Sequence, residues 1–402
     1  MINRHPIISV ILPIHNESAT IERCLNAILA QDYPSDRMEI LIVDGMSTDD
    51  TRDILKKFIL HNSSFILLDN PGKIVPTGLN RALLRAKGEI IIRVDGHTLI
   101  APDYVRRCVE TLQRTQADNV GGRMNAVGNT PFGKAVALAT STPFGIGGGR
   151  FHYSDNEEWV DTVYMGAWPR QVFEKIGLFD EELVRDQDDE FNYRLRAAGG
   201  KVLLDPQIKS EYTVRSTPGA LWRQYYQYGY WKVRVLQKHP RQMSLRQFVP
   251  PTFVLTLLLS ALYFLFSTLF SPLSPSCTLC SSWLKALHPL IFHPSYFVPV
   301  LYLLANLTAS LWAVIKKART ISSCSKADGI SSRSKADGTD RSLLSILYSL
   351  LHLPLVFSIL HLSYGLGFLA GLVKFRNRWK DREGKVPRFD YAPVQRHFPL
   401  AR

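Results

Sequence analysis

Residues 88–97 read GEIIIRVDGH, and this stretch decides the fold. Its apolar run, 90–92, consists of isoleucine and leads through Arg93 and Val94, a pattern typical of a strand buried in a sheet. The expected strand ends at Asp95, so it would carry a carboxylate at its carboxyl end, the edge where open α/β sheets bind ligands. Since an aspartate in this position caps a turn about as often as it binds a ligand, the rest of the chain must decide.

The first half of the chain alternates between strand and helix patterns. Compact apolar runs predict strands, and apolar residues at helical spacing predict the helices between them. Such alternation favours a parallel, doubly wound sheet. We expect Ser47 or Thr48 to cap the helix after the second strand. Strands are expected at 7–12, 39–43, 65–68, 90–95, 119–125, 160–170 and 202–204, and helices at 19–29, 76–86, 102–114 and before Gly199.

Composition divides the chain of 402 residues into two parts. Residues 1–245 have the mixed composition of a soluble α/β domain, and residues 246–402 are far more apolar. The net charge is +13, and much of it lies in 215–246 and 374–388, beside hydrophobic stretches. This placement favours an anionic membrane face over nucleic acid. We therefore expect a catalytic domain at 1–245, a transmembrane region at 246–402, and no nucleic-acid partner.

The apolar part contains candidate membrane segments at 252–270, 296–315 and 343–373. A membrane helix needs about 20 apolar residues. Between the second and third segments, SSCSKADGI is followed by SSRSKADGT, a polar duplication that predicts a flexible linker at about 318–342. The N-terminal apolar run is too short for a signal peptide. We expect a multi-pass protein of the cell membrane with its catalytic domain facing the cytoplasm.

The number of crossings stays open in the sequence. Two spans would return the basic linker to the cytoplasmic side, as the positive-inside rule prefers. A third simple span would place the basic sequence 374–385 outside, against that rule. Either 343–373 is a bent or re-entrant hairpin, or part of 252–315 does not cross.

Carboxylates occur where several of the predicted elements meet one edge of the sheet. Asp44 ends the second strand and Asp95 the fourth, Glu17 follows the first strand, and Asp188 and Asp189 open the late helix. Packing does not explain this pattern, because a buried carboxylate is costly unless it has a partner or a role. We expect these side chains to form one active site.

Four motifs then resemble, in order and spacing, those of family 2 glycosyltransferases over the first ~230 residues, and are most similar to succinoglycan-type sugar transferases. The resemblance implies a GT-A-like (Rossmann-like) fold, with a mostly parallel sheet, helices on both faces and a C-terminal helical membrane region. The motifs are SVILPIHNE at 9–17, LIVDGMSTDDT at 41–51, NRALLRAKGEIIIRVDGH at 80–97 and DQDDEFNYRLRAAG at 186–199.

The resemblance also implies roles on the donor side. Pro13, His15 and Glu17 match the loop that lines the nucleotide pocket, and Asp44 matches the acid that contacts uracil or ribose. Asp95 matches the first acid of the family's DxD-type motif, which contacts the diphosphate and the metal. The second acid is replaced by His97, and imidazole suits Mn²⁺ better than Mg²⁺. The implied cofactor is thus a divalent metal, Mn²⁺ or Mg²⁺.

On the acceptor side, Asp188 aligns with the catalytic base of the family's Glu-Asp pair, with Gln187 in place of the glutamate. Asp189 is adjacent, so either could be the base. We favour Asp188 because of its distance from Arg194. That arginine is one or two turns away on the same helix, so it could form an ion pair with either aspartate or hold the acceptor.

A helix at about 220–240 carries Gln227 and Trp231, two residues of the Gln-x-x-Arg-Trp motif of processive members. Tyr230 stands where that motif has arginine, which weakens a processive reading. The composition also suits an amphipathic aromatic helix at the membrane interface. An interfacial role and contact with the acceptor are both compatible with these residues.

The expected function is inverting transfer of a sugar from a nucleotide-sugar, preferably a UDP-sugar, to a polyprenyl-linked or polysaccharide acceptor in exopolysaccharide or envelope glycan synthesis, beside membrane lipids. A processive polysaccharide synthase is the alternative within enzymes, and a non-catalytic membrane scaffold is the alternative outside them. A nucleotidyltransferase would need a basic phosphate loop after the first strand, and PIHNES at 13–18 is not one.

Overall fold

The structure is a computed structural model that describes residues 5–62, 64–242, 244–270, 294–327 and 335–389. It divides into two compact units. The first, here the sheet unit, comprises residues 1–125, 149–213 and 381–402, and the second, the helical unit, comprises 126–148 and 214–380. Each unit is described by itself.

The sheet unit is built on a mixed sheet with the strand order β3-β2-β1-β4-β8-β6-β9-β5 and with β7 paired to β9. The strands β3, β2, β1 and β4 are parallel, and β8 joins β4 in the antiparallel direction. The bounds are β1 Ile8–Ile14, β2 Met38–Asp44, β3 Phe65–Asp69, β4 Ile90–Arg93, β5 Thr98–Ile100, β6 Asn119–Val127, β7 Glu158–Trp159, β8 Tyr164–Pro169 and β9 Val202–Thr213.

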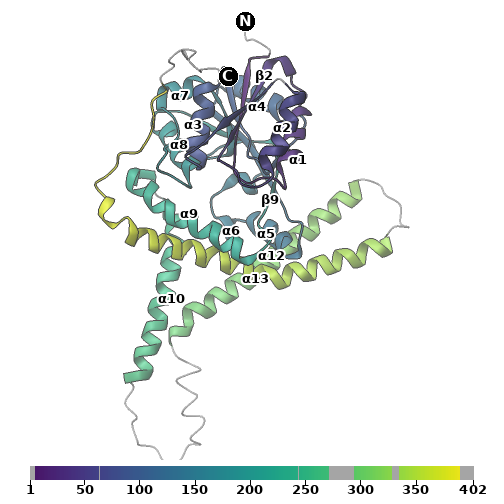
Figure 1. Ribbon diagram of the computed structural model, residues 1–402. Coiled ribbons are helices and arrows are strands. Elements are labelled where there is room, and N and C mark those ends of the chain that lie inside the picture. Colours follow the sequence, from purple (N-terminus) through teal and green to yellow (C-terminus); the bar gives the residue numbers. More distant parts are fainter. Residues whose placement is uncertain (1–4, 63, 243, 271–293, 328–334, 390–402) are drawn as a thin grey trace, which may run out of the picture. The chain divides into compact units, whose positions relative to one another are not determined.

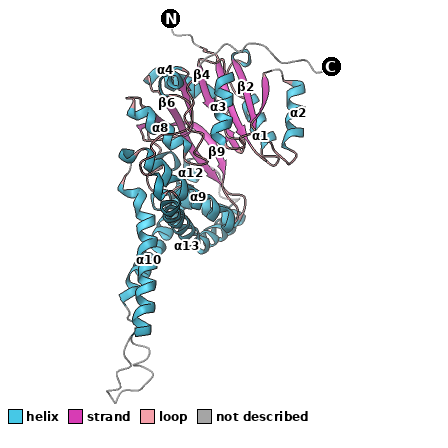
Figure 2. Ribbon diagram, turned by 60° about the vertical axis from the view of Figure 1, so that its left-hand side comes forward, coloured by secondary structure: helices cyan, strands magenta, loops and turns pink. Residues whose placement is uncertain are grey.

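Helices cover both faces of this sheet, because successive side chains of a strand point to opposite sides. In β1, Val10 belongs to the core cluster that contains buried residues of α1, α2 and α4, whereas Ile11 belongs to the cluster that contains buried residues of α3, α7 and α8. Figures 1 and 2 show these helices around the strands. The predicted α/β fold with helices on both faces is confirmed, but the sheet is mixed and not mostly parallel, because β8 runs antiparallel between β4 and β6 and β9 pairs antiparallel with β5 and β7. The helix bounds are α1 Ile21–Leu29, α2 Thr51–His61, α3 Val75–Arg85, α4 Tyr104–Thr115, α7 Gln171–Ile176 and α8 Gln187–Ala197.

The strand predicted at 202–204 is much longer, since β9 continues to Thr213. Asp205 lies within the strand and not in the turn that a following proline suggests. Its buried carboxylate accepts hydrogen bonds from Thr111 Oγ1 at 2.7 Å and from Gln207 N at 2.9 Å. These bonds satisfy the polar groups around Pro206, so the chain stays extended there.

The segment before α8 is held by Asn80 of α3. Asn80 donates to Phe179 O at 2.9 Å, and its own oxygen accepts from Phe179 N at 2.9 Å. Its side chain is only 2% exposed. One side chain therefore satisfies both backbone groups of Phe179, in the segment that leads to Asp188.

Replacing Asn80 by alanine is expected to lower the free energy of unfolding by about 2–4 kcal/mol, because it leaves a buried N–H and a buried C=O without partners. Arg81→Ala is the control, since the exposed Arg81 donates to Asp69 O on the surface, and it should change stability by less than about 1 kcal/mol. Thermal unfolding of the purified protein in detergent measures both. Equal melting temperatures for the two variants would contradict the bonding role of Asn80.

The helical unit contains α5 Pro131–Thr140, α6 Pro143–Ile146, α9 Pro218–Lys238, α10 Leu245–Phe270, α12 Phe297–Ala327 and α13 Lys335–Lys374. The flexible linker predicted at 318–342 is wrong in part, because α12 continues to Ala327 and α13 begins at Lys335, while residues 328–334 lie outside the described part. Intrinsic propensity does not explain the two extensions, because 320–327 and 335–342 are rich in Ser, Thr, Asp and Gly. The hairpin alternative for 343–373 is also wrong, since α13 is one continuous helix through Pro354.

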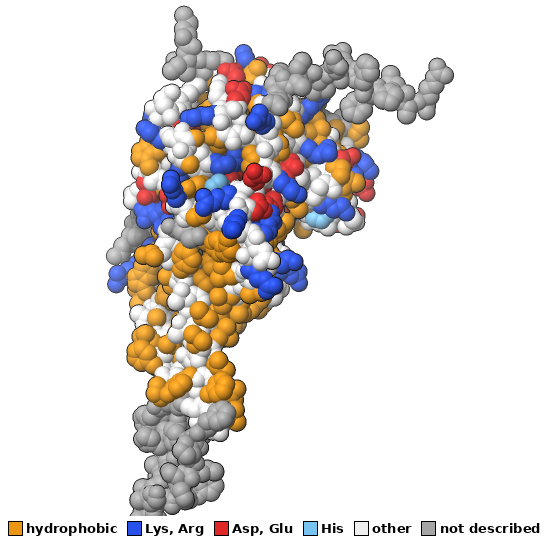
Figure 3. All heavy atoms as spheres, turned by 90° about the vertical axis from the view of Figure 1, so that its left-hand side faces the viewer, with side chains coloured by type: hydrophobic (Ala, Val, Ile, Leu, Met, Phe, Trp, Pro, Cys, Tyr) orange, Lys and Arg blue, Asp and Glu red, His pale blue; other side chains and the backbone are white. Residues whose placement is uncertain are grey.

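Three helices of the described part are long and apolar enough to cross a membrane: Leu245–Leu269, Pro294–Arg319 and Leu351–Lys374. Large hydrophobic side chains are exposed along α10 and α12, among them Leu258 and Leu304. Figure 3 shows a broad hydrophobic area on the molecular surface. These features indicate a membrane protein.

Candidate active site

Arg93 joins two of the predicted site residues. It is the last residue of β4, and its Nε donates to Asp95 Oδ1 at 2.8 Å while Nη2 donates to Asp95 Oδ2 at 3.3 Å. Its Nη1 donates to Asp188 Oδ1, on the first turn of α8. The guanidinium is buried, with 5% of the residue exposed. Burial would lower the pKa of Arg93, but Asp188 and Asp95 outweigh it and raise that pKa, so the side chain stays charged.

The sequence-based site did not include Arg93. The signal was a lone arginine that follows three isoleucines in a strand expected to be buried on both faces. A buried guanidinium is almost always paired with carboxylates. Asp95, two residues away, was the obvious first partner, but nothing local points to Asp188.

Asp188 keeps 32% of its side chain exposed. Burial raises the pKa of its carboxyl, Arg93 opposes this rise, and the negative charges of Asp95 and Asp189 add to it. A raised pKa makes the carboxylate more basic, and partial exposure leaves it accessible, so it suits a group that accepts a proton from a substrate. Asp189 follows directly, half-buried on the same turn.

Of the two alternatives for Arg194, the ion pair with Asp188 or Asp189 is wrong. Arg194 Nε instead donates to Glu190 Oε1 at 2.6 Å, one helical turn away, and Nη2 donates to Leu178 O at 2.7 Å. The i, i+4 spacing to Glu190 explains the choice. The preference for Asp188 as the base therefore rests on its contact with Arg93 and not on its distance from Arg194.

Glu17 and His97 come together from two different loops. His97 Nδ1 lies 2.9 Å from Glu17 Oε1, and Thr20 Oγ1 donates to Glu17 Oε2 at 3.0 Å. The turn between Asp95 and His97 is tight, because a Cβ on Gly96 would lie 2.7 Å from a side-chain carbon of Ile14. The first-strand loop and the DGH turn thus form one surface.

A divalent cation would fit at this surface only if phosphate oxygens of the substrate supplied some of its ligands. Within the described part of the chain, no group of three His, Cys, Asp or Glu residues could hold a metal ion. A carboxylate offers about four lone-pair positions, and Arg93 uses two of those on Asp95. Magnesium sites for phosphates commonly use one or two carboxylates plus phosphate oxygens and water. Asp95 fits that pattern, and His97 would have to join through Nε2.

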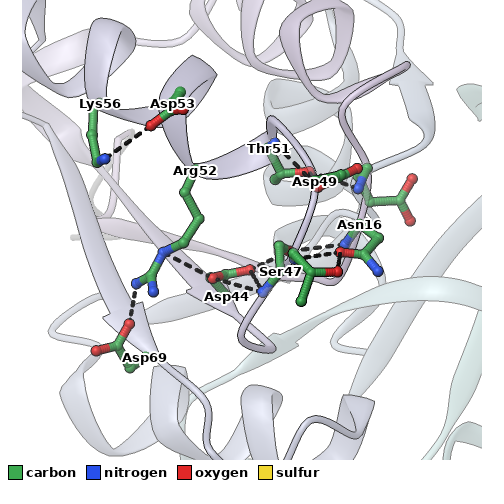
Figure 4. Close-up of polar contacts among 11 residues, drawn as sticks. Asn16, Asp44, Ser47, Asp49, Thr51, Arg52, Asp53, Lys56 and Asp69 are labelled. Atoms are coloured by element: carbon green, nitrogen blue, oxygen red, sulfur yellow. Dashed lines mark hydrogen bonds and ion pairs between the residues drawn. The ribbon is translucent and has the colours of Figure 1, made fainter.

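Asp44 shapes the loop after β2, as Figure 4 shows. Its carboxylate is fully buried, accepts from Ser47 Oγ at 2.5 Å, and lies 3.1 Å from Arg52 Nε. Asn16 N donates to Ser47 Oγ at 2.8 Å, and Thr48 N donates to Asn16 Oδ1 at 2.8 Å. The loops after β1 and β2 are therefore locked together.

Neither Ser47 nor Thr48 caps α2, so that prediction is wrong. The helix begins at Thr51 with Asp50 before it, and Ser47 is used by Asp44 instead. The other predicted nucleotide-pocket residues lie beside this locked pair of loops. Pro13 is half-buried in β1, and His15 is exposed directly after the strand.

Gln227 and Trp231 lie on α9 in the helical unit, and both are half-buried. The ring centroids of Trp231 and Phe375 are 5.7 Å apart. Tyr230, which replaces the arginine of the processive motif, has its ring centroid 5.1 Å from that of Phe375. Within this unit the aromatic residues of α9 pack against the end of α13.

Comparisons with known proteins agree with the motifs. A family model described as glycosyl transferase family 2 matches residues 9–177, a range that includes Asp95 but ends before Asp188. The succinoglycan biosynthesis protein ExoA of Rhizobium meliloti (strain 1021) is 30% identical over 243 residues, covering 60% of this chain and 73% of that protein.

Two further proteins are similar to this chain. A dolichyl N-acetyl-alpha-D-glucosaminyl phosphate 3-beta-D-2,3-diacetamido-2,3-dideoxy-beta-D-glucuronosyltransferase of Methanococcus voltae is 32% identical over 239 residues, covering 58% of this chain and 74% of that protein. The mannosyltransferase PcManGT from Pyrobaculum calidifontis, solved with GDP-Man and Mn²⁺, is 17% identical with a TM-score of 0.48, covering 92% of this chain and 88% of its own.

Proposed function

Since the chain belongs to glycosyl transferase family 2 and is a glycosyltransferase, we propose that it moves one sugar from a UDP-sugar to a polyprenyl-linked or polysaccharide acceptor, with inversion at the anomeric carbon. The acceptor belongs to exopolysaccharide or cell-envelope glycan synthesis, and the sheet unit faces the cytoplasm from a multi-pass membrane anchor. The observation that carries the proposal is the Arg93 guanidinium, bonded to both Asp95 and Asp188.

The chemistry divides between the two aspartates. Asp188 accepts the proton of the acceptor hydroxyl, whose oxygen attacks the anomeric carbon as the bond to the diphosphate breaks. Asp95 and the Glu17–His97 pair lie on the donor side. A divalent cation at Asp95, with His97 as a second ligand, would neutralise the charge of the leaving diphosphate. Arg93 fixes the two carboxylates relative to each other, and such positioning removes much of the entropic barrier.

The test is transfer by membranes that contain the full chain. Each of several radiolabelled nucleotide-sugars is supplied with Mn²⁺ and a lipid extract, and the products are sized. One added sugar on a lipid supports the proposal. A long polymer would point to the processive synthase, which the loss of arginine at Tyr230 argues against. If no donor were transferred or hydrolysed, the non-catalytic scaffold would be the remaining alternative.

Arg93→Gln is expected to move the acid limb of kcat to higher pH. The Arg93 charge opposes the raised pKa of Asp188, so removing it raises that pKa further. The base must be deprotonated, and activity is lost as the pH falls through its pKa; a higher pKa therefore loses activity at higher pH.

The matched variant is Arg93→Lys, which keeps the charge and should shift the limb less. kcat measured across about pH 5 to 9 separates the variants, with melting temperatures as the check on folding. An unchanged acid limb in a folded Arg93→Gln protein would show that Arg93 does not act on the catalytic base.

A further inference from the structure

The last described residues of the chain pack back onto the sheet unit. Lys385 N donates to Asp180 Oδ1 at 2.9 Å, and Lys385 O accepts from Glu181 N at 2.9 Å. Pro387 O accepts from Leu178 N at 3.0 Å. Asp180 is fully buried. Residues 381–389 are thus a built part of the sheet unit.

This return constrains the membrane anchor. The chain leaves the sheet unit after residue 213 and re-enters it at 381, and all three apolar helices lie between these points. A folded unit stays on one side of a membrane, so the number of crossings between residues 213 and 381 must be even. Three single spans are therefore excluded.

The third apolar helix, 351–374, differs from the other two in its packing. Half of its most apolar stretch is buried within the structure, against 6% for Leu245–Leu269 and 22% for Pro294–Arg319. Its neighbours include α9 and the short segment α5–α6, and it also contacts α10 and α12: Asn306 Nδ2 of α12 donates to Pro354 O at 3.0 Å, and a Cβ on Gly365 would lie 2.6 Å from Pro250 O of α10. Contacts with α10 and α12 are also expected within a bundle of membrane helices, whereas contacts with α9 and α5–α6 join the helix to segments that do not cross.

The end of α13 lies lengthwise on α9 through glycines. A Cβ on Gly229 would lie 2.0 Å from Tyr364 O, and one on Gly367 would lie 2.0 Å from Tyr226 O. Gln237 Nε2 donates to Phe375 O at 2.7 Å. Figures 1 and 2 show the two helices side by side. The helix α9 also carries four cationic residues: Arg223, Lys232, Arg234 and Lys238. Placing these charges in the hydrocarbon core would be costly, so α9 is not expected to lie within the bilayer core.

The middle of the same apolar helix contacts α6. His361 Nε2 lies 2.8 Å from Phe144 O, and the rings of Phe357 and Phe144 are 4.9 Å apart. Residues 126–148 leave the sheet unit and return to it. Their longer helix, α5, has ten residues and so spans about 15 Å, half the thickness of a bilayer core. This excursion cannot cross, and the middle of the third apolar helix is in contact with it.

We propose that the chain crosses the membrane twice, through α10 and α12, and that residues 351–374 lie with α9 on the membrane face occupied by the sheet unit. The exposed apolar sides of α10 and α12 then contact lipid acyl chains. Leu245–Leu269 has 25 residues, about 37 Å of helix, which exceeds the ~30 Å hydrocarbon core. The basic sequence 374–385 stays on the side of the sheet unit. The proposal does not depend on the sugar chemistry.

The proposed topology is tested by labelling single cysteines in sealed right-side-out and inside-out vesicles that contain the full chain. Of the five cysteines, Cys24 and Cys108 are buried. In a background with Cys277, Cys280 and Cys324 changed to serine, Leu60→Cys marks the sheet unit on an exposed position of α2, and Arg382→Cys marks the returning segment. The third protein keeps Cys277, which lies in sequence between α10 and α12.

A membrane-impermeant maleimide should label Leu60→Cys and Arg382→Cys in the same vesicle orientation and Cys277 in the other. Label on Arg382→Cys in the orientation opposite to Leu60→Cys would overturn the even count. Label on Cys277 from the Leu60 side, or from neither side, would overturn the α10–α12 crossing. Protease digestion of a C-terminal epitope tag on the unsubstituted chain shows independently on which side of the membrane the returning segment lies. This measurement is free of any effect of substitution on folding.

Discussion

Asp188→Asn is expected to lower kcat for sugar transfer by roughly 10²–10⁴-fold, the usual contribution of a positioned general base. The amide keeps the size of the side chain but cannot accept the proton of the acceptor hydroxyl. Binding of the donor should change little, because Asp95 and the Glu17–His97 pair remain. Initial rates at saturating donor, together with UDP affinity by calorimetry, measure the two effects separately.

Asp189→Asn, on the same helical turn, decides which carboxylate is the base. We expect it to lose less than about tenfold, a change of about 1.4 kcal/mol in the barrier. Asp53→Asn on the surface of α2, where that side chain is 71% exposed, controls for loss of negative charge. If Asp189→Asn loses the larger factor while Asp188→Asn stays active, the base role belongs to Asp189.

Asp95→Asn is expected to reduce kcat/KM by about 10²–10³-fold, because it removes charge at the place where the diphosphate is stabilised. Unlike Asp188→Asn, it should also abolish the dependence of UDP affinity on Mn²⁺. Calorimetric titration of UDP with and without Mn²⁺ distinguishes the two variants. The Asp53→Asn protein again serves as the control.

A folded Asp95→Asn protein that binds UDP more tightly with Mn²⁺ than without it would assign the metal to other ligands. His97→Asn then identifies them, since the amide removes the imidazole while the Asp95 carboxylate stays in place. Loss of the Mn²⁺ effect in that variant alone would move the metal role from Asp95 to His97.

Local pattern was sufficient for much of the sheet unit. The isoleucine run before Asp95 predicted β4, and branched apolar runs predicted β1, β2 and β3, because burial on both faces of a parallel sheet favours apolar residues at most positions. The motifs also singled out Asp44, Asp95 and Asp188 as candidate site residues, and those roles stay predictions. Local pattern could not place β9 past Pro206, since its continuation depends on side-chain bonds from Asp205 to Thr111 and Gln207.

The sequence by itself therefore determined the family, the strands that form the sheet edge and the presence of apolar helices, since all three are written in local spacing and composition. Tertiary structure alone decided the partners. Arg93 is 95 residues from Asp188, and residues 385–387 are more than 200 from the segment at 178–181 that they bond. A charge or a backbone group can pair with many others of opposite polarity, and only the folded chain selects one of them. Hydropathy likewise shows how apolar residues 351–374 are, but it does not show which residues they contact. Only the packing of α13 on α9 identifies those residues.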